Sequence, residues 1–265
     1  DLRQGRVYVV DTHNHRGQVF DAQGGLLRQW GSEGSAPGQF REPWAIAVDE
    51  GGYIYVADTW NHRIQKFDSD GRFLAQWGTF GDTAGGLGVG DLLYGPRVIV
   101  IDQESNLWVC DTGNKRLLKF TSDGEFLQQV GGAGSLPGEF LEPVGLALDS
   151  DGNLYVADTW NQRVQKLDKN GSFVAEWPVL GWEAEGVTNK PYLALDSRGN
   201  VYATVPEEHR VVQFDGSGQV KAVWGQYGTD GNSFNLPSDI AVDAQDNVYV
   251  EDSGNHRVVK FSAIK

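Results

Sequence analysis

One short motif recurs six times along the chain and constrains its fold more than any other feature. Residues 57–77 read ADTWNHRIQKFDSDGRFLAQW and residues 157–177 read ADTWNQRVQKLDKNGSFVAEW, which agree at 13 of 21 positions. The four further copies are DTHNHR, DTGNKR, VPEEHR and DSGNHR, which begin at residues 11, 111, 205 and 252. The arginines that close the copies are separated by 47, 53, 47, 47 and 47 residues and are Arg16, Arg63, Arg116, Arg163, Arg210 and Arg257. A period of this length indicates a repeat architecture.

Each repeat contains four apolar runs of strand length. In the second repeat they cover residues 44–48, 53–57, 63–67 and 73–77, and Gly, Asp, Asn and Pro bound them. Four strands in about 45 residues is the period of a propeller blade, and helical repeats are disfavoured because glycine interrupts every candidate helix. The sequence therefore predicts an all-β fold, a six-bladed β-propeller of four-stranded antiparallel blades. We expect one domain over residues 1–265, with repeats near 1–37, 38–90, 91–137, 138–184, 185–231 and 232–265.

The repeat resembles a known family. The pattern P-x-x-I-A-V-D, then Y-V-A-D-T-x-N-H-R-I-Q-K-F, then G-x-F, is similar to the NHL repeat over essentially the whole chain. The chain also resembles NHL domains appended to large bacterial membrane proteins with glycosyltransferase-like transmembrane regions. This second resemblance implies an extracytoplasmic location, secreted or at the cell surface, with attachment to a membrane-anchored parent chain. Because the chain starts at Asp1 and contains no methionine, we expect it to be a processed or excised fragment.

Charge and cysteine content restrict the partners. The chain has 36 acidic and 22 basic residues and a net charge of −14, so a polyanion would be repelled at long range. RNA binding, which the resemblance to animal NHL domains suggests, is therefore disfavoured, and no nucleic-acid partner is expected. The single cysteine, Cys110, excludes an intrachain disulfide. It replaces the alanine found at Ala57 and Ala157, so we expect a small buried core residue.

The D-T-x-N-x-R motif is predicted to connect the second and third strands of each blade. Asp and Asn favour such turns because their side chains bond nearby backbone amides, and the arginine can pair with a carboxylate and hold adjacent repeats together. Since the motif repeats, a structural role is favoured over a ring of ligand-binding groups. The histidines of the motif lie on separate blades without a carboxylate-rich or cysteine-rich cluster, so no metal or other cofactor is expected; they are His15, His62, His209 and His256.

The positions at which the repeats differ are the candidates for recognition. In a propeller, the turns after the second strand and the connections that lead into each first strand emerge on one face, here called the top face. A position that only maintains the fold should look alike in every repeat, whereas these positions vary and include large aromatic residues. The predicted binding residues are Trp44, Trp60, Arg97, Trp160, Trp182, Tyr192 and Asp239. We expect them to bind a protein or a glycan, because tryptophan and arginine often anchor interfaces and aromatic rings also suit sugars.

Two more specific expectations follow from the repeat alignment. Trp60 and Trp160 occupy the same position, so both indoles are expected to be partly exposed on the top face. Arg97, Tyr192 and Asp239 enter first strands, so they are expected to converge at the mouth of the central channel.

Two longer connections interrupt the regular spacing. Residues 79–94 carry six extra residues and include Leu87, Val89, Leu92 and Leu93, and residues 179–190 contain Trp182 and two glutamates. An apolar loop of this kind over a rim is either a lid or a contact arm.

A metal-dependent hydrolase or lyase is the alternative function. Six-bladed propellers that resemble this fold include gluconolactonase-like hydrolases and amidating lyases, which hold a metal in the central channel. Here the expected inner strands read AIAVD, VIVID, GLALD, LALD and DIAVD, and Asp239 is the only charged group near an entrance. No nucleophile elbow, phosphate loop or zinc signature is present. A non-catalytic binding platform is therefore favoured, and the enzyme remains open on analogy of fold.

The strand count predicts two incomplete blades. The first repeat supplies only second, third and fourth strands, and the sixth supplies only first, second and third strands, which gives 22 strands instead of 24. An open inner edge exposes unpaired amides. We therefore expect residues upstream of Asp1 to provide the missing inner strand.

Overall fold

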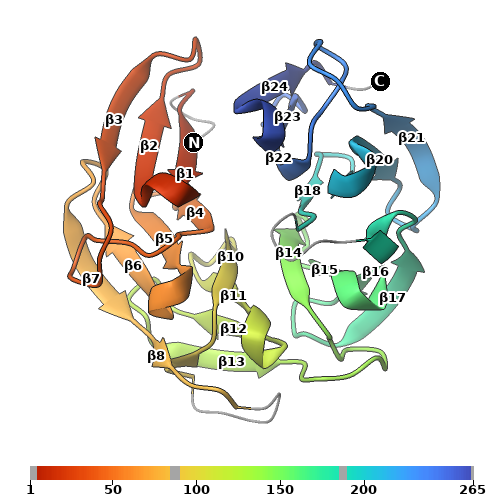
Figure 1. Ribbon diagram of the computed structural model, residues 1–265. Helices are drawn as coiled ribbons and strands as arrows, with labels where there is room; N and C mark the ends of the chain where they lie inside the picture. Colours follow the sequence, from red (N-terminus) through yellow and green to blue (C-terminus); the bar gives the residue numbers. More distant parts are fainter. Residues whose placement is uncertain (1–4, 84–89, 185–189, 264–265) are drawn as a thin grey trace. The chain divides into compact units, whose positions relative to one another are not determined.

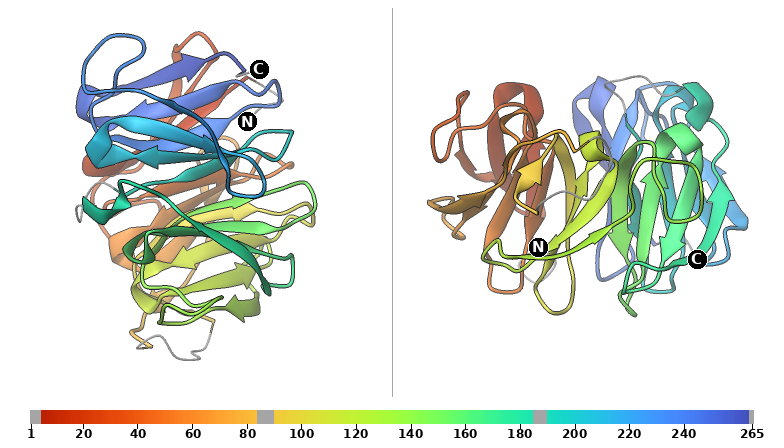
Figure 2. Two further views of the ribbon diagram at one scale, coloured as in Figure 1. Left: turned by 90° about the vertical axis from the view of Figure 1, so that its right-hand side faces the viewer. Right: turned by 90° about the horizontal axis from the view of Figure 1, so that it is seen from below.

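A computed structural model describes residues 5–83, 90–184 and 190–263. Contacts divide the chain into an N-terminal unit, Asp1–Ala133, and a C-terminal unit, Gly134–Lys265. Each unit contains three antiparallel sheets whose strands follow one another in chain order (Figure 1, Figure 2). In the described residues the only helices are 3-10 turns of three residues.

The three sheets of the N-terminal unit correspond to the first three repeats. The first sheet comprises β1 (Val7–Asp11), β2 (Arg16–Phe20) and β3 (Leu26–Trp30). The second comprises β4 (Ala45–Val48), β5 (Ile54–Asp58), β6 (Arg63–Phe67) and β7 (Phe73–Trp77). The third comprises β10 (Pro96–Ile101), β11 (Leu107–Asp111), β12 (Arg116–Phe120) and β13 (Phe126–Val130). A short parallel pair, β8 (Thr79–Phe80) and β9 (Leu92–Leu93), lies in the connection between the second and third sheets.

The C-terminal unit repeats this plan. Its first sheet comprises β14 (Pro143–Leu148), β15 (Leu154–Asp158), β16 (Arg163–Leu167) and β17 (Phe173–Pro178). The next comprises β18 (Leu193–Leu195), β19 (Val201–Val205), β20 (Arg210–Phe214) and β21 (Val220–Trp224). The last comprises β22 (Pro237–Val242), β23 (Val248–Asp252) and β24 (Arg257–Phe261).

A 3-10 turn follows the second strand of every four-stranded sheet and the corresponding strand of the other two. These turns are η1 (Thr12–Asn14), η2 (Thr59–Asn61), η3 (Thr112–Asn114), η4 (Thr159–Asn161), η6 (Pro206–Glu208) and η7 (Ser253–Asn255). The residue after each turn adopts a left-handed backbone, with φ between 53° and 57°. A separate turn, η5 (Trp182–Ala184), lies between β17 and β18.

The expected fold class is confirmed: the chain is an all-β, six-bladed β-propeller with antiparallel blades. The strands of the second repeat agree with the predicted runs to within one residue at each end. Four sheets have four strands, and the first and last have three in the described residues. This distribution confirms the predicted number of blade strands, 22 in all.

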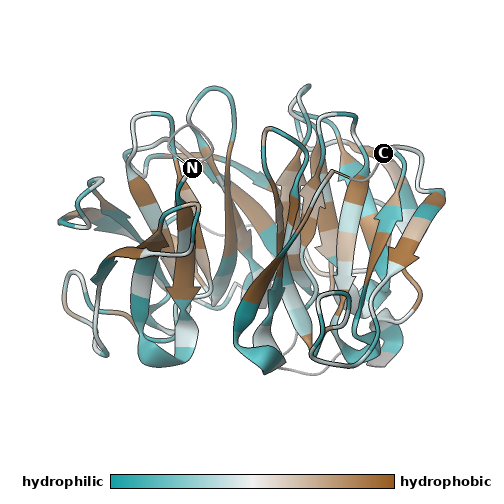
Figure 3. Ribbon diagram, turned by 90° about the horizontal axis from the view of Figure 1, so that it is seen from above, coloured by the Kyte–Doolittle hydropathy of each residue, from teal (hydrophilic) through white to brown (hydrophobic). Residues whose placement is uncertain are grey.

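Aromatic side chains pack successive blades of each unit against one another. Trp77, at the end of an outermost strand, contacts Phe120 of the next sheet with ring centroids 6.2 Å apart, and Trp177 contacts Phe214 in the same way at 6.1 Å. Gly124 lies under Trp77 with φ +88°, where a Cβ would come within 2.5 Å of the indole. This turn therefore requires glycine both for its backbone and for the close approach. Hydrophobic residues are concentrated in the strands, and hydrophilic residues are concentrated in the turns (Figure 3).

A buried aspartate organises four of the six turns. Asp58 is fully buried, and its carboxylate accepts hydrogen bonds from Arg63 Nε at 2.8 Å and from the backbone N–H of Arg41 at 2.7 Å. The same bond from a backbone amide recurs from Tyr94 to Asp111 (2.6 Å), from Leu141 to Asp158 (2.9 Å) and from Asn235 to Asp252 (2.6 Å). The polar residues that these repeats share thus form hydrogen bonds that maintain the fold, as the sequence predicts.

The arginine of the motif holds the connection that enters its own blade. The guanidinium of Arg63 donates to the carbonyls of Ser35, Ala36 and Gln39 at 2.8, 3.0 and 2.9 Å. The threonine of the same turn reaches in the other direction, because Thr59 Oγ1 donates to the carbonyl of Pro96 at 2.8 Å. The turn η2 therefore bonds both to the preceding connection and to the following blade.

Arg116 and Arg16 allow a matched test of this ion pair. Arg116 and Asp111 are both 0% exposed, and burial raises the pKa of Asp111 although the Tyr94 amide, Asn114 and Arg116 lower it. Arg16 and Asp11 form the same pair with side chains 33% and 24% exposed. We expect Arg116→Ala to lower the free energy of unfolding by about 3–5 kcal/mol, because it leaves a buried carboxylate without its partner. Arg16→Ala should cost about 0–1 kcal/mol.

Denaturant-induced unfolding of the two variants and the wild type measures this difference. Equal losses in the two variants would show that burial of the ion pair does not govern its contribution.

Candidate functional site

Two tryptophans of the D-T-W-N turns lie exposed on the surface. Trp60 in η2 is 41% exposed and Trp160 in η4 is 58% exposed. Each turn is held by its buried aspartate, so the side chain between Thr and Asn is free of the bonds that maintain the fold. The expected exposure of these two equivalent positions is confirmed.

The Trp60 indole forms one wall of a small open hollow in the N-terminal unit. The hollow has a volume of about 310 Å³ and is lined by Arg41, Glu42, Trp60 and His62. Trp60 Nε1 donates a hydrogen bond to Glu42 Oε2 at 3.1 Å. A carboxylate beside an exposed indole provides both a charged acceptor and an aromatic face to a ligand. We call this site the Glu42–Trp60 hollow.

Further aromatic side chains extend the surface beside this hollow. His62 contacts Trp60, Phe80 and Tyr94, with ring centroids 6.3, 4.8 and 5.8 Å away. Phe80 and Tyr94 contact each other at 5.4 Å, and Phe80 is 60% exposed. The parallel pair β8 and β9 positions these two residues, because Phe80 belongs to β8 and Tyr94 follows β9.

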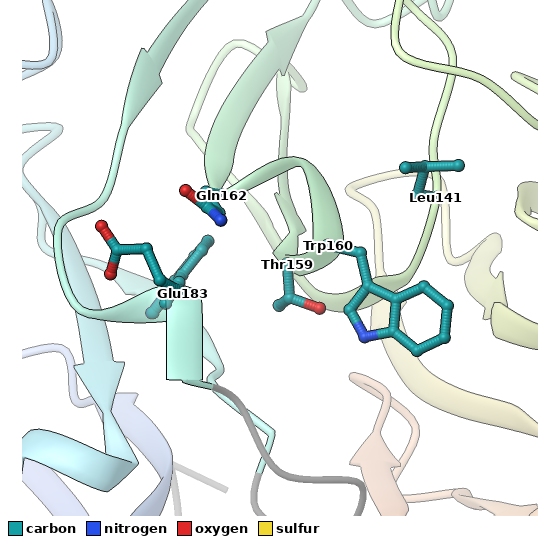
Figure 4. A pocket seen from close by; sticks show the side chains of 6 residues that line it. Leu141, Thr159, Trp160, Gln162 and Glu183 are labelled. Atoms are coloured by element: carbon teal, nitrogen blue, oxygen red, sulfur yellow. The ribbon is translucent and has the colours of Figure 1, made fainter.

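The C-terminal unit has a corresponding hollow beside Trp160. It has a volume of about 370 Å³ and is lined by Leu141, Thr159, Trp160, Gln162, Trp182 and Glu183 (Figure 4). Glu142 corresponds to Glu42, and its Oε2 accepts a bond of 2.8 Å from Lys190 Nζ. Lys190 Nζ also lies 5.7 Å from the centroid of the Trp160 ring. Neither Glu142 nor Lys190 lines the hollow, so we call the hollow the Trp160 hollow and the cluster of Glu142, Trp160 and Lys190 the Glu142–Trp160 site.

Three of the predicted binding residues are buried instead of presented to solvent. Trp182 is 1% exposed, joins the hydrophobic core and donates from Nε1 to the carbonyl of Thr204 at 3.0 Å. Arg97 is buried with its guanidinium 4.4 Å from the centroid of the half-buried Trp44 ring. Tyr192 is buried and its backbone N–H donates to Thr204 Oγ1. The expectation that Trp182, Arg97 and Tyr192 present their side chains on the surface was wrong, because each completes local packing. The predicted convergence of Arg97, Tyr192 and Asp239 remains a prediction.

Asp239 has an unusual environment in the C-terminal unit. It lies where the register of β22 and β23 shifts between Pro237 and Ile240, and its surface is accessible to solvent. Desolvation, with a smaller effect from the charge of Glu251, raises the pKa of Asp239 to about 7. Solvent screens this effect, because the side chain is exposed. A carboxyl group that titrates near neutrality can serve as a general acid or base.

The connection at residues 79–94 was expected to be a lid or a contact arm, and its described part is anchored in the core. Leu93 is fully buried in a hydrophobic cluster of the N-terminal unit, so it anchors the connection instead of projecting from it. Leu87 and Val89 lie outside the described residues. The connection at residues 179–190 brings Lys190 to Glu142.

Cys110 is fully buried in β11, as expected, and burial raises the pKa of its thiol. Within residues 5–83, 90–184 and 190–263, no three His, Cys, Asp or Glu side chains come together as metal ligands. In the same part of the chain, no helix has the length and apolar character needed to cross a membrane.

The comparisons with known proteins agree with this repeat architecture. A family model described as NHL repeat matches residues 40–67, 140–167 and 234–261, which are the second, fourth and sixth repeats. The chain carries NHL repeats. Two of the three matched NHL repeats contain the D-T-W-N turns and thus the exposed tryptophans. No curated protein sequence matches the chain.

Several solved structures share the fold at low sequence identity. A protein of unknown function from Bacteroides caccae has a TM-score of 0.71 and 13% identity, with 97% of this chain and 90% of that chain covered. Virginiamycin B lyase from Staphylococcus aureus has a TM-score of 0.67 and 14% identity, with 98% and 78% covered. A gluconolactonase from Xanthomonas campestris has a TM-score of 0.64 and 16% identity, with 94% and 80% covered. These likenesses show the propeller fold alone.

The sequence analysis did not single out Glu42 and Glu142, although the sequence contains a signal for them. Glu42 and Glu142 each precede the proline that leads into a first strand, as Glu-Pro. The other repeats have Gly95, Lys190 and Leu236 before this proline. Glutamate therefore occurs there only in the two NHL repeats whose turn contains tryptophan, which indicates that the two residues act together.

The histidines of the NHL repeats have a structural role that the sequence did not reveal. The Nδ1 atoms of His15, His62 and His209 accept hydrogen bonds of 3.0, 3.2 and 3.2 Å from the backbone N–H groups of Glu42, Gly95 and Leu236. The three donors have left-handed φ values of 47°, 62° and 55°. Each bond joins a turn to the entry of the next blade and requires an unprotonated Nδ1.

His62 is expected to make stability depend on pH. Burial, with a smaller effect from Arg41, lowers the pKa of His62 below its usual value of 6.5. Its neutral form therefore contributes stability that is fully present above about pH 6.5 and is lost as the pH falls through the lower folded pKa. We expect the unfolding free energy of the wild type to fall more steeply between pH 7 and pH 5 than that of His62→Gln. Gln162 occupies the equivalent left-handed position in η4, so glutamine suits the backbone.

Denaturant unfolding at several pH values compares the two proteins. The same pH dependence in both would rule out His62 as the titrating group.

Proposed function

We propose that this NHL-repeat propeller is a non-catalytic binding platform for a protein or glycan partner. The observation that carries the proposal is the pair of exposed indoles, Trp60 and Trp160, at equivalent turns. Trp60 bonds to Glu42, and the hollow beside Trp160 is lined by Glu183. Large aromatic side chains are unfavourable in water, and tryptophan often anchors interfaces.

The construction of the turns supports recognition as the role of these indoles. The buried aspartate and its arginine maintain each turn without help from the tryptophan. A rigid turn can present a side chain to a partner with little loss of conformational freedom on binding. The exposed aromatic surface of Trp60 and Phe80 adds apolar area in the N-terminal unit.

The remaining parts of the proposal concern the location of the protein, its attachment to a parent chain and the type of partner. We infer an extracytoplasmic location and attachment to a membrane-anchored parent chain, on the resemblance to NHL domains of bacterial membrane proteins. The net charge of −14 supports partners other than nucleic acids.

A hydrolase or lyase of the propeller type is the second candidate. The pKa of Asp239, raised to about 7 beside Glu251, favours it, since this carboxyl group can exchange a proton near neutral pH. Among proteins of the same fold, the neighbours named above include a lyase and a gluconolactonase.

Removal of the two indoles tests the binding platform. The wild type and the double variant Trp60→Ala/Trp160→Ala are compared on panels of immobilised glycans and peptides. For a ligand that both hollows hold, we expect the double variant to lose about 2 kcal/mol or more of binding free energy, roughly thirtyfold in Kd. Leu74→Ala, which removes an exposed apolar side chain from the outer strand β7, is the matched control and should bind like the wild type.

Both variants should retain the wild-type melting temperature, because exposed substitutions change stability by about 0.5 kcal/mol or less. Ligands that bind the double variant and the wild type equally would refute the role of the indoles.

An assay of lactone hydrolysis with and without added divalent metal tests the second candidate. If the enzyme candidate is correct, activity should depend on the metal and fall at least about tenfold in Asp239→Asn. Activity that is unchanged in Asp239→Asn would exclude this carboxyl group as the acid or base.

A further inference from the structure

Lys190 shows which chemical group the Glu-Pro and D-T-W-N elements accommodate. Its side chain is 1% exposed, and its Nζ lies 2.8 Å from Glu142 Oε2 and 5.7 Å from the centroid of the Trp160 ring. An ammonium group buried to this extent requires a carboxylate partner, and an aromatic face attracts it further. Glu142 and the Trp160 ring therefore form an ammonium site that a lysine of the same chain occupies, beside the open hollow and not within it.

The Glu42–Trp60 hollow has the equivalent glutamate, tryptophan and turn, but no lysine of the same chain is bound to its glutamate. Glu42 and Trp60 precede Glu142 and Trp160 by the same number of residues, and both turns have the same buried aspartate and arginine. In the described part of the chain, no lysine or arginine forms an ion pair with Glu42, whose Oε2 accepts only the weaker, uncharged Trp60 Nε1 bond.

We propose that the Glu42–Trp60 hollow binds the ammonium group of a lysine side chain of a partner protein, as the Glu142–Trp160 site holds Lys190. The inference rests on the proposed role as a binding platform and selects a protein partner over a glycan. The bound ammonium would replace the indole N–H at Glu42 and lie against the Trp60 ring.

The surroundings of the hollow fit a lysine on a protein surface. Phe80 and Tyr94 provide apolar area for the aliphatic part of the side chain and for its neighbours on the partner. The net charge of −14 attracts a basic partner at long range.

Arg41 is the one feature of the hollow that opposes a cation. It lines the Glu42–Trp60 hollow, whereas Leu141 takes the corresponding place in the Trp160 hollow. The side chain of Arg41 is exposed, so solvent screens its charge and its effect should be modest. This difference between the two hollows allows a sharp test, since Arg41→Leu makes the first resemble the second.

The experiment follows the indole N–H signals of the full chain by NMR. The probe is Nα-acetyl-lysine methylamide, and its uncharged control is Nα-acetyl-norleucine methylamide. Trp60→Phe and Trp160→Phe variants assign the two signals. We expect the lysine probe, but not norleucine, to shift the Trp60 signal in a saturable manner, with less effect at high salt.

Substitutions in the hollow should change the affinity in opposite directions. Glu42→Gln is expected to weaken binding roughly tenfold, because the carboxylate is lost while the shape is kept. Arg41→Leu should strengthen binding several-fold. In Lys190→Met the Trp160 signal should begin to respond to the lysine probe, because the internal ligand has been removed.

Four outcomes would overturn the inference. If the Trp60 signal responds equally to lysine and norleucine, or if Glu42→Gln leaves the affinity unchanged, ammonium recognition is wrong. If Trp60 responds to the oligosaccharide chitotetraose and not to lysine, the inference fails while the binding platform stands. If neither lysine nor any ligand of the panels depends on Trp60 or Trp160, both proposals fail.

Discussion

A buried carboxylate at the end of the second strand supports the rest of the blade in four of the six repeats. Asp58 joins the arginine of its own turn to an amide of the connection that enters the blade, and Asp111, Asp158 and Asp252 repeat the arrangement. The carboxylates are removed from water, so the bonds that compensate for their lost hydration must all form together. This requirement explains why Asp, Asn and Arg recur in nearly every repeat.

The same constraint leaves other positions of the turn free for function. The third residue of the motif contributes no side chain to the buried bonds, so it varies from Trp to Gly to His along the chain. Where it is tryptophan, the same blade carries a glutamate in the Glu-Pro pair, and the two glutamates have different partners. Glu142 accepts a hydrogen bond from the ammonium group of Lys190, whereas Glu42 accepts one from the indole N–H of Trp60.

The propeller fold itself does not separate a binding platform from an enzyme. The solved neighbours include both a lyase and a protein without a known function, at identities that show only the fold. The distinction depends on individual groups of this chain: the exposed Trp60 and Trp160 favour recognition, and Asp239 with its raised pKa favours proton transfer. The two sets of residues are separate and can be altered independently.

The sequence by itself determined the six repeats, the strands and the exposure of Trp60 and Trp160, because each depends on local periodicity and on turn chemistry. It also placed Cys110 in the core. Only the tertiary structure decided that Trp182, Arg97 and Tyr192 are buried and that Lys190 meets Glu142. Trp182 and Lys190 belong to an irregular connection, and Arg97 and Tyr192 lie at the entries of first strands, where the repeats differ. At these positions the repeat provides no template, and contacts between residues distant in sequence determine which side chains are covered.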